Sequence, residues 1–187
     1  MFGFASKLIM HNQLSFNEGK IDLFGEQILM FPTYCMVDTL KELEKNGSEY
    51  LFYKSFRELG IKFTQGLIKN YKMKTIDDLI RVGSGVIAMA GYGVVKVVSL
   101  NSTNHEVVIR LEKSSLADYY GKSDHPIDHL FRGIATGFMC VGFNDFTLEG
   151  VEISCRAMGA PNCDVLIKSK EKFDLTNALV AKQIKFD

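Results

Sequence analysis

The stretch from Gly150 to Lys168 constrains this chain most; it reads G-V-E-I-S-C-R-A-M-G-A-P-N-C-D-V-L-I-K. Glu152 stands three residues before Cys155, and a second thiol, Cys163, follows eight residues later. Glycine, proline and asparagine lie between the two cysteines, and these residue types predict a turn that folds the chain back on itself. A carboxylate and two thiolates brought together in this way match the ligands that Zn²⁺ accepts in a tetrahedron. The spacing therefore permits a metal site at the turn between two strands.

The proposed ligands carry a geometric condition. Residues three apart on a regular strand point to opposite faces, so Glu152 and Cys155 can reach one ion only if the strand bends. A bulge, or the end of the strand near Ser154, would supply that bend. The alternative is that Cys155 and Cys163 are a reduced, buried pair that packs two strands together, with Arg156 forming a salt bridge to Glu152.

Composition limits the classes of function that are open to the chain. The 187 residues suit one domain with a sizeable core, and 47% hydrophobic with 24% charged residues is ordinary for a globular protein. The formal net charge is zero, so no field would hold nucleic acid, and we expect no direct nucleic-acid binding. The sequence has no run of eighteen apolar residues and no signal peptide, which predicts a cytoplasmic protein without a membrane span. Cysteine clusters there favour metal binding over disulfides.

Hydrophobic periodicity and turn residues predict the order of the elements. We expect strands at residues 14–16, 20–24, 27–31, 94–100, 106–111, 146–155 and 163–168, and helices at 33–45, 49–71, 75–90, 114–120 and 127–143. This order predicts an α+β fold, with an antiparallel sheet and helices packed on one side. Gly133 and Gly137 lie four residues apart in the last predicted helix, which gives one of its faces the smoothness that close packing requires.

The C-terminal segment differs from the rest of the chain. We interpret residues 1–169 as a single domain and residues 170–187 as a C-terminal tail. Apolar residues recur in this tail at helical intervals, at Leu175, Leu179, Val180 and Ile184. The tail is either an amphipathic helix that docks on the body or on a partner, or a frayed terminus.

Two runs resemble a known family. H-P-I-D-H-L-F-R-G-I-A-T-G-F from His125 to Phe138 and E-x-x-C-R-A-M-G-x-P-x-C from Glu152 to Cys163 resemble the 4-vinyl reductase domain. That family of ligand-binding modules is related to the phenol-sensing domains of bacterial transcription regulators and to TRAPP vesicle-tethering subunits. The resemblance extends weakly upstream, over residues 19–32 and 48–67. It implies a TRAPP/4-vinyl-reductase-like fold and a homodimer.

The resemblance also implies a ligand set for zinc. In the phenol-sensing branch the ion is held by a cysteine at the start of the last helix and by an acid and two cysteines in the E-x-x-C-x7-C run. Glu152, Cys155 and Cys163 match three of these positions. The fourth position departs from the family, because it falls on Asp128, with His129 adjacent, and either side chain can coordinate zinc. The family pattern thus implies a structural zinc site completed by Asp128 or His129.

The sequence indicates binding rather than catalysis. It contains no nucleophile elbow, no phosphate-binding glycine loop followed by lysine and no HExxH motif, so we do not expect an enzyme. The first hypothesis is a non-catalytic sensor domain, in which the zinc site shapes a pocket for a small apolar or aromatic ligand and a separate output protein receives the signal. The bulky residues near the motifs that are candidates to line this pocket are Tyr92, Tyr119, Phe131, Phe138 and Phe143. The second hypothesis is a dimeric interaction or scaffold subunit, similar to TRAPP components, that binds no ligand.

Overall fold

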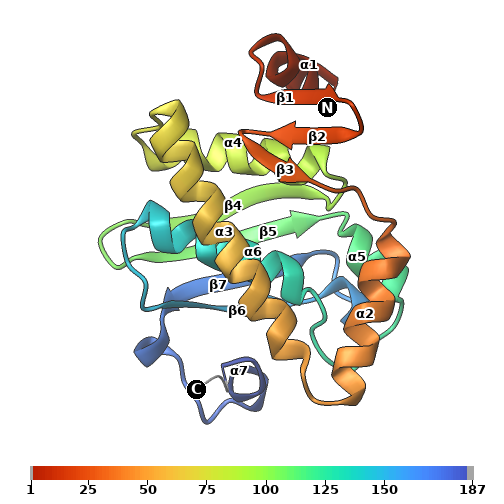
Figure 1. Ribbon diagram of the computed structural model, residues 1–187. Coiled ribbons are helices and arrows are strands. Elements are labelled where there is room, and N and C mark those ends of the chain that lie inside the picture. The colour runs from red at the N-terminus through yellow and green to blue at the C-terminus, as the bar shows by residue number, and fades with distance from the viewer. Residues whose placement is uncertain (1, 185–187) are drawn as a thin grey trace.

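The computed structural model describes residues 2–184, which form antiparallel sheets surrounded by helices (Figure 1). The residues 185–187 of the predicted tail lie outside the described residues. In chain order the elements are α1 (Phe2–Met10), β1 (Leu14–Asn17), β2 (Lys20–Leu23), β3 (Glu26–Ile28), α2 (Thr33–Lys45), α3 (Glu49–Tyr71), α4 (Ile76–Met89), β4 (Val94–Asn101), β5 (Glu106–Glu112), α5 (Ser115–Tyr120), α6 (His129–Gly142), β6 (Leu148–Ser154), the 3-10 turn η1 (Arg156–Met158), β7 (Cys163–Ser169), the 3-10 turn η2 (Lys170–Lys172) and α7 (Ala178–Gln183).

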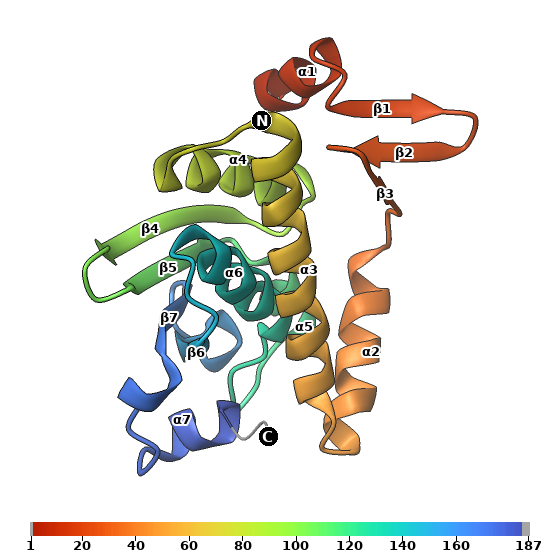
Figure 2. The same ribbon diagram turned by 60° about the vertical axis from the view of Figure 1, so that its left-hand side comes forward.

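The main sheet has the strand order β4-β5-β7-β6, and every neighbouring pair is antiparallel. Side chains alternate along its two central strands, so that Val107, Ile109, Val165 and Ile167 are all buried and lie on paired positions. Helix α6 covers this face, and α3 crosses on the outer side of α6 (Figures 1 and 2). The predicted α+β fold, with an antiparallel sheet and helices packed on one side, is confirmed.

The crossing of α3 and α6 depends on glycine. A methyl group at Gly133 or at Gly137 of α6 would collide with carbonyl oxygens of α3, and one at Gly60 of α3 would collide with the carbonyl oxygen of Ile134. Bare backbone on both sides therefore lets the two helix axes approach closely. The close packing predicted from the two glycines of α6 is confirmed. Among the described residues, no helix combines the length and the apolar composition that a membrane crossing requires.

A smaller sheet, with the order β1-β2-β3, projects away from the main sheet (Figure 2), and the ring of Phe24 after β2 packs on Phe63 and Tyr71 of α3. Its hairpin agrees with the prediction, but the third strand ends at Ile28, three residues earlier than expected. Helix α1 was not predicted from the sequence. Its start has no acidic residue in the first turn, and the ring of Phe4 packs where a side chain at Gly85 would otherwise lie. This helix is stabilised by tertiary contact rather than by local end signals.

Helix α7 docks on the opposite side of β6 from α6. Val151 of β6 and Leu166 of β7 are paired neighbours, and they pack against Phe173, Val180 and Ile184. Within the described part of the tail, residues 178–183 form a short helix that docks on the sheet.

We predict that Gly137→Ala lowers the free energy of unfolding by about 2 kcal/mol or more, because its methyl group would collide with the carbonyl group of Arg57. Gly66→Ala is the matched control, since Gly66 lies within α3 and a methyl group there meets no atom within 4 Å. That control should raise stability by roughly 0.5–1 kcal/mol through helix propensity. Urea denaturation measures both values, and equal effects of the two substitutions would contradict the close-packing interpretation.

Candidate ligand cavity and metal centre

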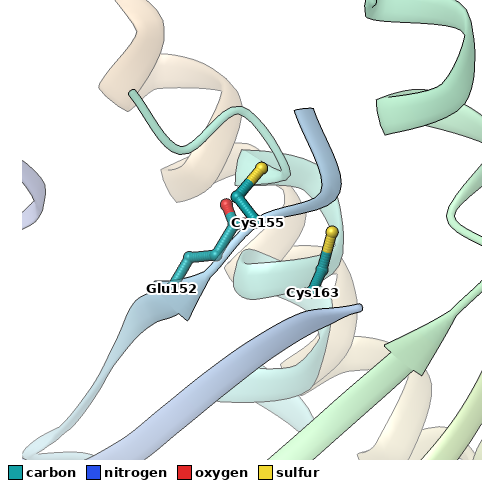
Figure 3. Close-up of side chains that lie close together, drawn as sticks. All are labelled: Glu152, Cys155 and Cys163. Carbon is teal, nitrogen blue, oxygen red and sulfur yellow. The ribbon is translucent and has the colours of Figure 1, made fainter. Parts of the chain in front are cut away.

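The side chains of Glu152, Cys155 and Cys163 converge where β6 ends and β7 begins (Figure 3). One carboxylate oxygen and the two sulfur atoms all lie within 4.8 Å of one another. All three residues are at most 1% exposed to solvent. The structure therefore brings together the acid and the two thiols of the E-x-x-C-x7-C run.

A bulge in β6 makes this convergence possible. Glu152 pairs with Val165 and Ser154 pairs with Asp164, so one strand has an extra residue at this point. The bend predicted near Ser154 is confirmed, and it turns Glu152 and Cys155 to the same side.

The salt bridge considered for Arg156 is wrong. In the turn after β6, the guanidinium group of Arg156 points outward and lies 2.6 Å from the carboxylate of Asp118 on α5. Glu152 points inward instead, and its Oε2 accepts a 2.9 Å hydrogen bond from the backbone N–H of Asp128.

Asp128, rather than His129, faces the cluster. Its carboxylate accepts a 2.6 Å hydrogen bond from the Ser114 hydroxyl and is in hydrogen-bonding contact with the thiol of Cys163. Asp128 lies beside these three residues and is not one of the side chains whose ligand atoms all lie within 4.8 Å of one another. The ring of His129 is directed elsewhere, because its Nδ1 accepts a 3.3 Å hydrogen bond from Arg132.

Burial disfavours the charged forms of the two carboxyl groups beside the thiols. Burial raises the pKa of Asp128 to about 6 and raises the pKa of Glu152 well above its usual range. The hydrogen bond that Cys163 donates lowers the pKa of Cys155 to about 5, and the same bond raises the pKa of Cys163. Within residues 2–184, Oε1 of Glu152 is buried without a hydrogen-bond partner. Two sulfur donors and a carboxylate with one orphaned oxygen fit three of the four ligands of a divalent zinc ion.

A large apolar cavity lies between the small sheet and the helices α3, α4 and α6. Its volume is about 660 Å³, and β4, β5 and the start of α5 complete its walls. Of the described residues that line it, none is charged, and those with polar side chains are Thr33, Ser84, Tyr92 and Ser115. The cavity can therefore enclose hydrocarbon, but it offers no ion pair to a ligand.

The five aromatic residues singled out in the sequence separate into two groups. Tyr92, Phe131 and Phe138 line the cavity. Tyr119 is 57% exposed on α5, and Phe143, the residue after α6, stacks on the ring of His105 with centroids 5.0 Å apart. Neither residue lines the cavity, since Tyr119 lies near the end of α5 and Phe143 directly follows α6.

Much of the cavity wall was not predicted from the sequence. The small sheet contributes Leu14, Phe16, Ile21, Leu23 and Ile28, and flexible methionines contribute from four further segments. The methionines were a weak sequence signal for a pocket, since this side chain adapts to ligands of irregular shape. No local pattern shows that the N-terminal sheet lies across the cavity from the helices.

A buried polar network beside the candidate metal centre was also not predicted from the sequence. Arg132 of α6 is wholly buried, and its Nη1 donates to the backbone oxygen and to Oε1 of Gln183 at 3.1 and 3.0 Å. The Gln183 amide also bonds to both backbone groups of Glu152, at 2.9 and 3.0 Å. Gln183 therefore joins α7 to the edge of the main sheet at a candidate metal ligand. The available signal was an arginine within an otherwise apolar helix, since a buried charge requires partners.

Comparison with solved structures identifies proteins of the same architecture. The phenol-responsive sensory domain of the transcription activator PoxR, solved with phenol, matches with a TM-score of 0.79 and 20% identity, covering 98% of this chain and 96% of that one. A vinyl-4-reductase family protein from Methanocaldococcus jannaschii matches with a TM-score of 0.53 and 18% identity, covering 78% and 85%. A trafficking protein particle complex subunit 3 from Naegleria fowleri, covalently bound to palmitic acid, matches with a TM-score of 0.51 and 11% identity, covering 76% and 97%.

The chain has the fold that these three proteins share. The resemblance seen in the two sequence runs is thereby confirmed at the level of fold. No protein-family model and no curated protein sequence matches the chain.

Proposed function

We propose that this protein is a non-catalytic sensor domain that binds a small, neutral, apolar ligand in its cavity. The observation that carries the proposal is the cavity of about 660 Å³ without a charged lining residue among those described. Its volume falls within the range of about 300–1,000 Å³ that is typical of ligand sites. The phenol in the PoxR sensory domain and the palmitic acid on the trafficking subunit support this proposal, because both proteins share the fold.

The size of the cavity supports an occupant. The cavity opens to solvent, and its wall leaves apolar side chains such as Met30 and Phe31 exposed. Apolar surface that stays in contact with water forgoes about 25 cal/mol per Å² of burial free energy. Apolar walls around so large a space are therefore suited to a ligand that replaces water and makes the missing contacts.

The chemistry of the walls indicates a neutral ligand. A charged ligand would lose its hydration without gaining an ion pair, which costs several kcal/mol. The hydroxyl groups of Ser84, Ser115 and Tyr92 can bond to at most a few polar atoms. Small aromatic or aliphatic molecules with little polarity fit these walls.

The proposed metal role is structural. Glu152, Cys155, Cys163 and Asp128 would hold a zinc ion, which neutralises the buried carboxylates and thiolates when it is bound. Four protein ligands close the coordination shell, so no position is open for a reacting water molecule. The site would join the β6–β7 turn to the start of α6, next to the cavity wall.

A contact with a second copy of the chain is favoured by one further observation. Leu29, Met30 and Phe31, which follow β3 at the edge of the cavity, are 74%, 77% and 63% exposed. Three consecutive exposed apolar residues are typical of a protein interface. We include a homodimer through this segment in the proposal; a scaffold role without ligand would use the same surface.

For the metal, we expect one zinc ion per chain in protein purified without chelator, and loss of the metal in Cys155→Ser and Cys163→Ser. At zinc concentrations about 100-fold above the dissociation constant, the bound ion should contribute about 2.7 kcal/mol to stability. Elemental analysis and denaturation with and without chelator measure these effects. Cys35→Ser, at a half-buried cysteine outside the cluster, is the control and should keep the metal.

For the ligand, we expect neutral hydrocarbons and phenols to raise the melting temperature, and charged benzoate to have no effect. Ala135→Phe should weaken binding by about tenfold or more, because the ring of the new side chain would occupy the cavity. Ala88→Phe, on α4 but outside the cavity wall, should bind normally. An unchanged melting temperature across the whole neutral panel would contradict the proposed function.

For the dimer, sedimentation velocity should show the unmodified chain as a dimer and Met30→Glu as a monomer, since a charge would be buried in the apolar contact. Leu175→Glu, at a residue that is 57% exposed in the C-terminal segment, should leave the dimer intact. A monomeric wild-type protein at all concentrations tested would rule out this contact.

A further inference from the structure

The start of helix α5 contacts the cavity and the metal centre at the same time. Ser115 and Leu116, the first two residues of the helix, line the cavity. Ser114, immediately before them, is wholly buried and caps the helix, because its Oγ accepts a 3.1 Å hydrogen bond from the N–H of Ala117. The same hydroxyl donates its proton to Oδ2 of Asp128 at 2.6 Å. A single residue thus separates the cavity wall from the metal centre.

A second part of the wall is joined to this turn. The backbone N–H of Ser115 donates a 2.9 Å hydrogen bond to the carbonyl oxygen of Tyr92, whose side chain lines the cavity. Burial raises the pKa of Tyr92, and the negative charge of Asp128 raises it further, so the tyrosine hydroxyl lies within the field of that carboxylate. The wall formed by Tyr92 and the first turn of α5 is therefore anchored to Asp128 through Ser114.

Asp128 also connects inward to the rest of the proposed metal site. Its backbone N–H donates to Glu152, and its carboxylate contacts Cys163. Phe131, three residues further along the chain, lines the cavity from the first turn of α6. The beginnings of α5 and α6 both carry wall residues, and the hydrogen bond between Ser114 and Asp128 joins them.

We propose that the buried Ser114–Asp128 hydrogen bond couples the cavity to the metal centre, so that each ligand strengthens the binding of the other. This inference rests on the proposed function. Asp128 would offer one carboxylate oxygen to the ion while Ser114 holds the other, as partners of metal ligands commonly do. A fixed carboxylate holds Ser114, and with it the wall residues of α5. A ligand that packs on those residues orders the same turn, which presents Asp128 to the metal.

Thermodynamic linkage makes the effect reciprocal. The factor by which the metal changes the affinity for the ligand must equal the factor by which the ligand changes the affinity for the metal. Couplings of this kind usually lie between about 5-fold and 150-fold. We expect a value of about fivefold or more.

The test uses the full chain and a neutral fluorescent dye, N-phenylnaphthylamine, as the probe of the cavity. Titrations with zinc-loaded and with chelator-treated protein give two dissociation constants, and that of the metal-free form should be about fivefold or more higher. Zinc titrations with and without dye should give the same ratio. Circular dichroism of each form shows that the compared proteins are folded.

Two substitutions of Ser114 test whether the coupling depends on its hydrogen bond to Asp128. Ser114→Gly removes the hydroxyl but keeps a residue that helix N-termini accept, so α5 should persist. This substitution should bring the ratio of the dye dissociation constants, metal-free over zinc-loaded, close to one. It should also weaken zinc binding by about tenfold or more. Ser114→Thr keeps the hydroxyl and should retain the coupling. Ser169→Ala, a buried serine at the far end of β7 from Cys163, should behave as wild type.

The outcomes separate this inference from the function on which it rests. Absence of dye binding by every form would overturn both. Dye binding with equal affinity in the zinc-loaded and metal-free forms would overturn the coupling and leave the sensor function standing. A ratio that survives in Ser114→Gly would show that the communication does not pass through this hydrogen bond, and would overturn the inference.

Discussion

Helix α6 is enclosed by the main sheet on one face and by α3 on the other, and most of its residues are buried. An enclosed helix has no solvent-facing side on which to place its polar groups, so each must find a partner inside the protein. The same enclosure demands backbone-to-backbone contact where α3 crosses, and this explains the glycines at 133 and 137. Both proposed binding sites are built on this helix: the metal centre at its first residues and the cavity along its side.

The Arg132 side chain of α6 contacts residues that are remote in sequence. Arg132, a cation that is wholly buried, bonds to Gln183 and lies 4.1 Å from the ring centroid of Tyr53. Leaving such a charge unpaired would cost several kcal/mol, which makes the docking of α7 part of the core rather than an addition to it. Since Gln183 also bonds to Glu152, the C-terminal helix, the edge strand and the candidate metal ligand form one connected network.

The cavity and the candidate metal centre lie close together but would bind their ligands through different interactions. The cavity is apolar and its binding would be driven by removal of hydrocarbon from water. The candidate metal centre consists of buried acids and thiols, and burial raises the pKa values of its two carboxyl groups because their charged forms lose hydration. The first turns of α5 and α6 lie between the two sites, and the proposed coupling would pass through them.

Local patterns in the sequence were sufficient for much of the fold. Helix α2 and helix α3 agree with their predicted limits: Pro32 directly precedes α2, and Gly47, with a positive φ of 62°, lies in the break between the two helices. The strands β5 and β7 and the turn between Cys155 and Cys163 were likewise predictable from local patterns. A bend near Ser154 was expected as the condition for Glu152 and Cys155 to face the same side, and the structure forms it as a bulge.

Contacts between segments that are distant in sequence determined the features that local patterns did not predict. The sequence by itself determined the turn that brings Cys163 back to Cys155, and it permitted Glu152 to join them if the strand bends. Only the tertiary structure shows that Asp128 faces the cluster and that the ring of His129 does not, since Ser114 and Arg132 bind the two side chains in different directions. The cavity walls were not predictable either, because they combine the N-terminal sheet with helices that are distant in sequence. Periodicity and turn chemistry act over a few residues, whereas a pocket and the last ligand of a metal site are made by packing across the whole molecule.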